Sequence, residues 1–172
     1  MPRNPDPVPL DPARILRALD AHGVAYLLIG GMAAVAHGAA YVTLDLDITP
    51  QRTAGNLDRL AAALTELGAA LRVPGDPDPV PVAIDARTFG QMQTMTFRTA
   101  AGDLDVAFRP DGTGGYDDLN RRRVVVAAFG LAIPVAHLDD VIRSKEAAGR
   151  EKDRLALPLL RRLQERLADP EL

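Results

Sequence analysis

The sequence predicts a mixed α/β (α+β) fold: one sheet flanked by helices, with a short helical cap at the C-terminal end. Helical and strand patterns alternate in the first half of the 172 residues, and strand patterns dominate from residue 92 to residue 135. Two helical patterns follow. We therefore expect three parts, which are an extended proline-rich tail over 1–10, a core over 11–136 and a helical segment over 137–172 packed on that core.

The first elements have clear start and stop signals. Asp11-Pro12 is typical of a helix N-terminus, and Gly23 ends the apolar stripe that follows. The apolar run over 24–29 has strand length, and Gly30-Gly31 turns the chain into a short helix over 32–37. This order predicts a buried strand that leads through a glycine turn into a helix.

The next segment alternates acidic and apolar residues. Residues 43–49 place Asp45 and Asp47 on one face of a predicted strand that Pro50 ends. Leucines at helical spacing predict a helix over 53–67, and four prolines make 74–81 a surface loop.

The second half predicts two pairs of strands and two helices. Segments 92–98 and 103–108 form a hairpin, with Asp103 in its turn because it follows Gly102 directly. A glycine-rich loop over 111–115 precedes two short strands, 124–129 and 131–135. The C-terminal helices are predicted over 137–148 and 151–167, with Pro158 dividing the second into two pieces.

Composition excludes several classes of protein. There is no cysteine, so disulfide scaffolds, zinc–thiolate sites and cysteine nucleophiles are ruled out. Aromatic residues make up 4% and tryptophan is absent, which argues against a base-stacking RNA platform. The uncharged run over 23–44 is long enough to span a membrane, but its four glycines fit a strand, a turn and a helix better. We expect a cytoplasmic protein without a membrane segment or signal peptide.

Charge is unevenly spread along the chain. Residues 1–120 hold 9 basic and 15 acidic side chains, whereas residues 121–172 hold 11 basic and 8 acidic ones. Such asymmetry suits a metal-binding part and an anion-binding part, although solvated helix faces alone produce it as well. Only two of the basic residues, Lys145 and Lys152, are lysines, which marks that segment as a place where a compact ammonium is needed.

Three carboxylates are candidates for chemistry. Asp45 and Asp47 repel each other on one strand face unless a cation lies between them, and Mg²⁺ prefers such oxygen ligands. Asp105, on the second hairpin strand, either completes that site or accepts a proton from an attacking hydroxyl, and Asp103 is its rival. Gly30 and Gly31 are either a plain tight turn or a place where backbone amides approach phosphate oxygens.

Together these residues resemble the nucleotidyltransferase superfamily with the DNA polymerase β-like core. The resemblance rests on Leu-Ile-Gly-Gly at 28–31, Leu-Asp-Leu-Asp-Ile at 44–48 and Leu-Asp-Val at 104–106. The later run from Ser144 to Asp153 is similar to the AbiEii/MenT-type nucleotidyltransferases, which are toxins of bacterial toxin–antitoxin pairs. The resemblance spans about residues 24–160.

The resemblance implies a role for each matching residue. Asp45, Asp47 and Asp105 would hold Mg²⁺, as two ions, and the first two would be essential for turnover. Gly30 and Gly31 would face the phosphates of a nucleoside triphosphate (NTP), and Lys145 would touch the triphosphate. Arg150 and Asp153 would belong to the rim of the active site. The implied reaction is transfer of a nucleoside monophosphate to an acceptor hydroxyl with release of pyrophosphate.

The acceptor has three readings. The resemblance implies the 3′ end of tRNA, with a cognate antitoxin as protein partner, and Arg121, Arg122 and Arg123 could then contact RNA phosphates or simply be a solvated turn. A second reading is nucleotidylation of a partner protein, which suits the acidic overall charge. A third is a catalytically idle module that binds nucleotide or a partner.

Overall fold

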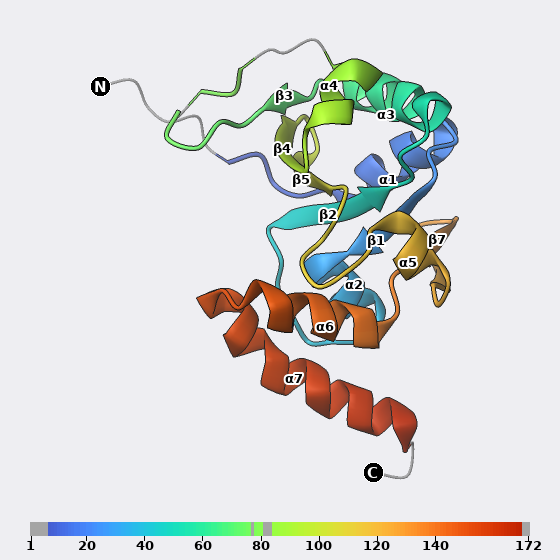
Figure 1. The fold of residues 1–172 in the computed structure, drawn as a ribbon, viewed down its shortest axis with the longest axis vertical. Coiled ribbons are helices and arrows are strands. Elements are labelled where there is room, and N and C mark those ends of the chain that lie inside the picture. Colours follow the sequence, from blue (N-terminus) through green and yellow to red (C-terminus); the bar gives the residue numbers. More distant parts are fainter. Residues whose placement is uncertain (1–6, 77, 81–83, 170–172) are drawn as a thin grey trace.

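The structure, a computed structural model, describes residues 7–76, 78–80 and 84–169 (Figure 1). Its strands form one mixed sheet in the order β3-β4-β5-β2-β1-β7-β6. The strands are β1 (Tyr26–Ile29), β2 (Asp45–Pro50), β3 (Ala70–Leu71), β4 (Thr94–Thr99), β5 (Gly102–Ala107), β6 (Val124–Ala128) and β7 (Leu131–Val135). The helices are α1 (Pro12–Ala21), α2 (Gly30–Ala36), α3 (Ala54–Glu66), α4 (Ala86–Gln91), α5 (Tyr116–Asn120), α6 (Leu138–Ala148) and α7 (Glu151–Ala168).

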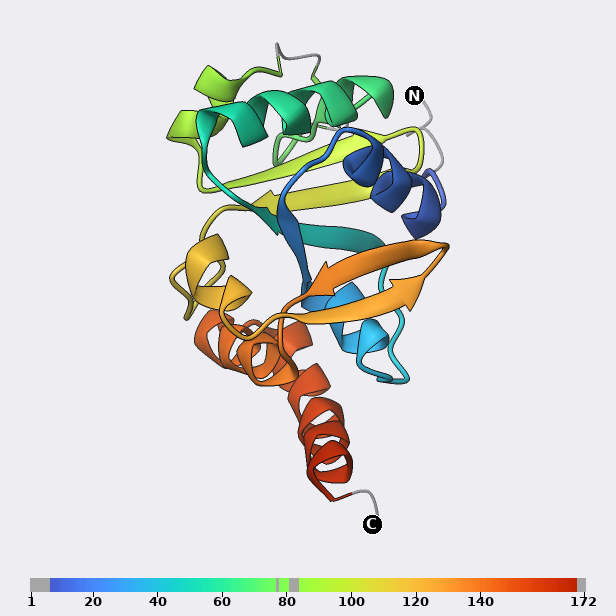
Figure 2. The same ribbon diagram turned by 90° about the vertical axis from the view of Figure 1, so that its right-hand side faces the viewer.

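Helices lie on both sides of this sheet. Helices α1 and α3 pack together on one side, whereas α2, α6 and α7 lie on the other (Figures 1 and 2). The apolar side chains of β2, Leu46 and Ile48, are fully buried in the core, which leaves Asp45 and Asp47 on the opposite face. The predicted fold class is therefore confirmed.

The predicted strand–glycine–helix unit is present as β1 and α2. Strand β1 is buried along its whole length and pairs antiparallel with β2, with Ile29 opposite Asp47. Helix α2 begins at Gly30, whose φ of 63° is a left-handed conformation that glycine adopts without a steric penalty. The short helix thus starts directly beside the acidic strand.

The hairpin β4–β5 corrects the predicted position of Asp103. Its turn is formed by Ala100 and Ala101, and Gly102 already pairs with Thr99, so Asp103 lies within β5 and not in the turn. Strand β5 pairs in parallel with β2 in a register that sets Asp103 opposite Asp45 and Asp105 opposite Asp47. Alternate residues of a strand share a face, so Asp45, Asp47, Asp103 and Asp105 all lie on one face of the sheet.

The C-terminal helices differ from the prediction at one point. Helix α6 begins after His137 and ends at Gly149, which adopts φ 61° as a left-handed cap. Helix α7 runs continuously from Glu151 to Ala168, so Pro158 does not divide it. Proline has no backbone N–H, so the carbonyl four residues before Pro158 has no donor within the helix. Pro158 is exposed, so water can bond that carbonyl instead.

Three short elements were not predicted, namely β3, α4 and α5. Within the described residues, no helix is long and apolar enough to cross a membrane. Of the expected tail, residues 1–6 lie outside the described part, and residues 7–10 form neither helix nor strand. Residues 77 and 81 of the expected surface loop also lie outside it.

Candidate active site

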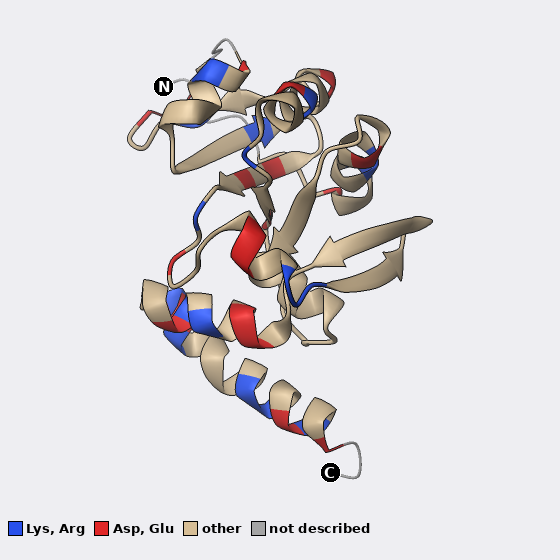
Figure 3. Ribbon diagram, turned by 45° about the vertical axis from the view of Figure 1, so that its right-hand side comes forward, with Lys and Arg blue, Asp and Glu red and all other residues tan. Residues whose placement is uncertain are grey.

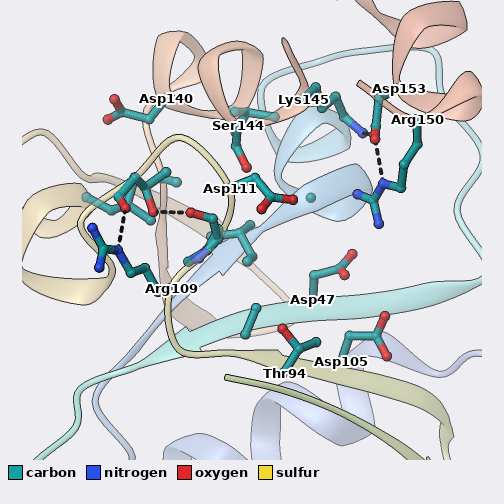
Figure 4. A pocket seen from close by; sticks show the side chains of 18 residues that line it. Asp47, Thr94, Asp105, Arg109, Asp111, Asp140, Ser144, Lys145, Arg150 and Asp153 are labelled. Carbon is teal, nitrogen blue, oxygen red and sulfur yellow. Dashed lines mark hydrogen bonds and ion pairs between the residues drawn. The ribbon is translucent and has the colours of Figure 1, made fainter. Parts of the chain in front are cut away.

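Two carboxylates meet on the open face of the sheet. Asp47 on β2 and Asp105 on β5 are register partners in a parallel pair, so their side chains project side by side (Figure 4). The Oδ1 atom of Asp105 is buried and has no hydrogen-bond partner. A buried carboxylate oxygen without a donor is costly, and the cost falls when a cation or a proton is bound.

The electrostatics of this pair point the same way. Burial, together with the charges of Asp45 and Asp105, raises the pKa of Asp47 to about 7, although Lys152 and Lys145 oppose the rise. Burial also raises the pKa of Asp105 against a hydrogen bond from the Thr96 side chain. In the absence of a counter-ion, both acids therefore bind a proton more readily than an exposed aspartate does.

Gly30 and Gly31 pack against the acidic strand and the loop before it. A Cβ at Gly30 would collide with the Asp47 carboxylate. A Cβ at Gly31 would lie 2.9 Å from Thr43 Oγ1 and 2.9 Å from Tyr41 Cε1. Both positions require glycine for close approach, and this holds the start of α2 against Asp47.

A group of cations faces the acids from the C-terminal helices. Asp153 on α7 is fully buried, and it accepts hydrogen bonds from Lys145 Nζ at 3.2 Å and from Arg150 Nε at 2.7 Å. Burial disfavours the Asp153 charge, but the hydrogen bonds from Arg150 and Lys145 hold its pKa below the usual range. Asp153 is therefore a buried anchor for two cations and does not lie on the rim, where the sequence had placed it.

One pocket contains both groups. Its walls include Gly30, Asp47 and Asp105 on the sheet side and Lys145, Arg150 and Asp153 on the helix side. Figure 4 shows the two acids across the pocket from the Lys145–Asp153–Arg150 cluster, and Figure 3 shows basic positions gathered where α6 meets α7. The residues with the strongest sequence signals thus come together, although Asp45 and Gly31 do not line the pocket.

Asp45 has a local partner instead. Thr43 Oγ1 donates to Asp45 Oδ1 at 2.9 Å. Within the described residues, no three acidic or histidine side chains are arranged as a ready metal site. The donor set nevertheless fits a hard cation, because Asp47 and Asp105 offer carboxylate oxygens only, and one of those oxygens has no partner.

Asp103 and Asp105 differ in their partners and in their access to the pocket. Asp103 accepts hydrogen bonds from Arg72 at 2.7 Å and from Arg98 at 3.3 Å, and it does not line the pocket. Asp105 lines the pocket and has no basic partner in the described part of the chain. Asp105 is the third acid that the site geometry favours.

The arginine triplet is not gathered into the pocket. Arg122 bonds Asp140 at 2.6 Å and Asp139 at 3.3 Å, which ties it to the start of α6. Arg123 bonds Asn120 Oδ1 at 3.1 Å. These contacts weaken the case for the triplet as an RNA-binding cluster, because Arg122 is held in ion pairs with Asp139 and Asp140.

Sequence reasoning missed several residues that line the pocket. The loop after β5 contributes Arg109 and Asp111, the sheet side includes Thr94, and the helix side includes Asp140 and Ser144 (Figure 4). The glycine-rich pattern over 111–115 was the available signal, because Gly112 with φ 68° allows the loop to pack on Arg143 and Ala147 of α6. Lys152 was noticed as one of two lysines, and its charge does act on Asp47 and Asp105.

The fold is nucleotidyltransferase-like, as comparison with solved structures shows. The lincosamide antibiotic adenylyltransferase LnuA, solved with lincomycin bound, is similar over 90% of this chain and 99% of its own (TM-score 0.62, 17% identity). A Thermotoga maritima protein proposed to be a nucleotidyltransferase is similar over 89% and 90% (TM-score 0.54, 16% identity). ANT(2'')-Ia in complex with adenylyl-2''-tobramycin is similar over 86% and 83% (TM-score 0.52, 14% identity). No protein-family model and no curated protein sequence matches this chain.

Proposed function

We propose that this protein transfers a nucleoside monophosphate from an NTP to an acceptor hydroxyl and releases pyrophosphate. The observation that supports it best is the pairing of Asp47 with Asp105 in a pocket whose other wall carries Lys145 and Arg150. Acids that lack a cation and cations that face a cavity are the two halves of a site for a metal-bound triphosphate. Similarity to adenylyltransferase structures adds support through the fold.

In this proposal, Asp45, Asp47 and Asp105 would hold Mg²⁺, with Asp45 released from Thr43 to join the other two. Bound Mg²⁺ would neutralise phosphate charge and align the attacking and leaving oxygens. Lys145 and Arg150 would bind the triphosphate, and Asp153 would orient both of them. Gly30 and Gly31 would let the phosphates approach the backbone at the start of α2.

The transfer step is an in-line displacement. The acceptor oxygen would form a bond to the α-phosphorus while the bond from that phosphorus to the pyrophosphate oxygen breaks. The acceptor proton would pass to the Asp105 carboxylate, which lines the pocket and has no hydrogen-bond partner on its Oδ1 atom. Lys145 would stabilise the charge that develops on the departing pyrophosphate.

For the acceptor, we propose the 3′ end of tRNA, with a toxin role and a cognate antitoxin. Its support is the resemblance of the Ser144–Asp153 run, in which Lys145, Arg150 and Asp153 form one bonded cluster. The formal net charge of −3 and the tied Arg122 count against a large RNA surface. Contact with the tRNA terminus alone would require only the pocket and its mouth.

A small hydroxylated molecule is the second candidate acceptor. Its support is similarity to LnuA over 99% of that protein's length, because LnuA was solved with the small antibiotic lincomycin bound. Asp111 adds negative charge to the pocket wall, which would favour a cationic acceptor over a phosphodiester. Nucleotidylation of a partner protein and an idle binding module stay open as outcomes of the test.

The test separates these acceptors in one experiment. The protein is incubated with Mg²⁺ and each of four α-labelled NTPs, together with total tRNA, a panel of aminoglycosides and lincosamides, or no acceptor. Asp47→Asn serves as the inactive control, and Asp103→Asn serves as a matched acid-to-amide change outside the pocket. Label on tRNA supports the tRNA acceptor, and label on a small molecule supports a small hydroxylated acceptor. Label on protein supports nucleotidylation of a partner protein. No label in any arm, with no Mg²⁺–NTP binding by calorimetry, contradicts the proposed function.

A further inference from the structure

Strand β6 leaves one edge of the sheet unpaired within the described residues. It is the outermost strand and pairs only with β7. Val125 on this strand is 60% exposed, Ala127 is exposed on the same face, and neither β6 nor β7 carries a charged residue (Figures 2 and 3). The edge strands of sheets are usually protected by charges, prolines or bulges, and β6 contains neither a charged residue nor a proline.

The hydrogen-bond pattern shows which groups face outward. Phe129 and Gly130 form a two-residue turn, so the flanking Ala128 and Leu131 are a hydrogen-bonded pair. Bonded and non-bonded pairs alternate along an antiparallel ladder. Val125 and Ala127 therefore direct their backbone N–H and C=O groups away from β7, towards the free edge.

Phe129 is unusual at the tip of this hairpin. Its φ is 56°, and it is the only non-glycine residue with a positive φ in the described part of the chain. Turns of this kind normally use asparagine or glycine at the first position, because a bulky residue is strained there. The ring is nonetheless 47% exposed. The chain thus holds an aromatic ring at the edge strand despite a strained backbone.

We propose that β6 pairs antiparallel with β6 of a second copy of this chain, about a two-fold axis through Val126. In that register Val125 lies opposite Ala127 of the second copy, so the outward backbone groups of both strands meet as hydrogen-bonded pairs. The two exposed apolar side chains pack against each other across the new ladder. Two sheets become one continuous sheet.

The same register gives Phe129 and Arg123 a partner. Residues 123 and 129 lie just beyond the two ends of β6, so residue 123 of one copy comes near residue 129 of the other, which brings a guanidinium towards an exposed aromatic ring. Arg123 is already held at the entrance to β6 by its hydrogen bond to Asn120. The chain therefore carries both members of a cation–aromatic pair at the two ends of β6, and this favours a second copy over an unrelated strand, although Arg17 of the same chain bonds the Phe129 carbonyl at 3.3 Å.

Electrostatic repulsion does not oppose this arrangement. The basic segment 121–123 leads directly into β6 (Figure 3). Antiparallel pairing places the two Arg123 residues at opposite ends of the ladder, roughly 20 Å apart, beyond the Debye length of about 8 Å at physiological salt. Parallel pairing would bring them together. Strands β2 and β5, which carry the acid pair, lie three and four positions from β6, so pairing leaves the pocket open.

Sedimentation equilibrium tests the pairing with two variants that change the same two exposed positions. Val125→Lys/Ala127→Lys places like charges opposite each other in the proposed register, whereas Val125→Lys/Ala127→Glu places opposite charges there. We expect wild type to reach twice the 18.4 kDa chain mass in the micromolar range. The Lys/Lys variant should raise the dimer dissociation constant at least tenfold, and the Lys/Glu variant should stay dimeric. Circular dichroism checks that both variants fold.

Three results would overturn the proposal. If the wild type sediments as a monomer throughout the micromolar range, the proposed pairing is wrong. A Lys/Lys variant that dimerises as well as the Lys/Glu variant shows that β6 is not the interface. The third result concerns RNA. If the wild type is a monomer that binds tRNA, and Arg123→Ala binds tRNA more weakly, the basic segment binds RNA instead of a second copy. Phe129→Asn adds an independent check, because it should weaken the dimer while raising the melting temperature of the diluted monomer.

Discussion

The two walls of the pocket differ in how their charges are balanced. On the helix wall, buried Asp153 satisfies Lys145 and Arg150, and its pKa is lowered despite burial. On the sheet wall, the pKa of both Asp47 and Asp105 is raised, and one oxygen of Asp105 has no partner. The helix wall is complete as it stands, whereas the sheet wall is stabilised by whatever cation it binds.

The largest expected effect is on turnover at the incomplete wall. Asp47→Asn and Asp105→Asn should each lower pyrophosphate release at least ~1000-fold, because each removes charge where a metal-bound triphosphate would be held. Labelled-NTP assays measure the change, and circular dichroism shows whether the fold is kept. Activity within tenfold of wild type in either variant would contradict the assignment of the acid pair.

The next effect concerns stability at the complete wall. Asp153→Asn leaves Lys145 buried without a charged partner, so the free energy of unfolding should fall by about 3 kcal/mol. The double variant Lys145→Met/Asp153→Leu removes both charges and should recover most of that loss in urea titrations. Its NTP binding should nevertheless be lost. A double variant as unstable as the single one would show that packing, not charge balance, sets the effect.

A third effect is the pH dependence of stability without divalent cations. The Asp47 pKa rises from 3.8 in the unfolded chain to about 7 in the fold, so the fold favours the protonated carboxyl. The contribution of Asp47 to the free energy of unfolding is complete below its unfolded-state pKa of 3.8 and is lost as the pH rises through about 7. In EDTA, the free energy of unfolding should fall by about 3 kcal/mol between about pH 4 and pH 7, since one pKa unit is worth about 1.4 kcal/mol. Thermal denaturation should show a flatter profile for Asp47→Asn, and an unchanged profile would contradict the shift.

The smallest effect is expected at Asp103. This residue is on the same sheet face but is paired with Arg72 and Arg98, both outside the pocket. Asp103→Asn should change turnover less than about threefold and stability by less than about 1 kcal/mol, as for other exposed ion pairs. A loss as large as that of Asp105→Asn would exchange the two roles.

Most of the fold was predictable because its signals are local. The alternation around Asp45 and Asp47 indicates a strand face, and the glycines after residue 29 mark the turn beside it. Elements of two to six residues, such as β3 and α4, are too short to show a period. Pro158 misled because its effect depends on exposure, which a helix pattern alone does not reveal.

The site was predictable only in part because its partners are distant in sequence. Asp103 and Asp105 share a strand, and only the three-dimensional neighbours Arg72 and Arg98 separate their roles. The pairing of Arg122 with Asp140 likewise depends on how α6 docks, and it decides that the arginine triplet is not a free cluster. Burial of Asp153 is set by tertiary packing as well, so the resemblance, which implied a rim position, could not reveal it.

The parallel pairing of β2 with β5 has a consequence for how the chain matures. Asp47 and Asp105 belong to strands separated by α3, β3, α4 and β4, and the cations opposite them come from α6 and α7 still further along. Closing such long loops is slow, so the pocket forms late in folding. A nascent chain that has emerged from the ribosome only as far as β5 holds both acids without their opposing cations. The complete pocket should therefore appear after the bulk of the sheet, when the last two helices dock.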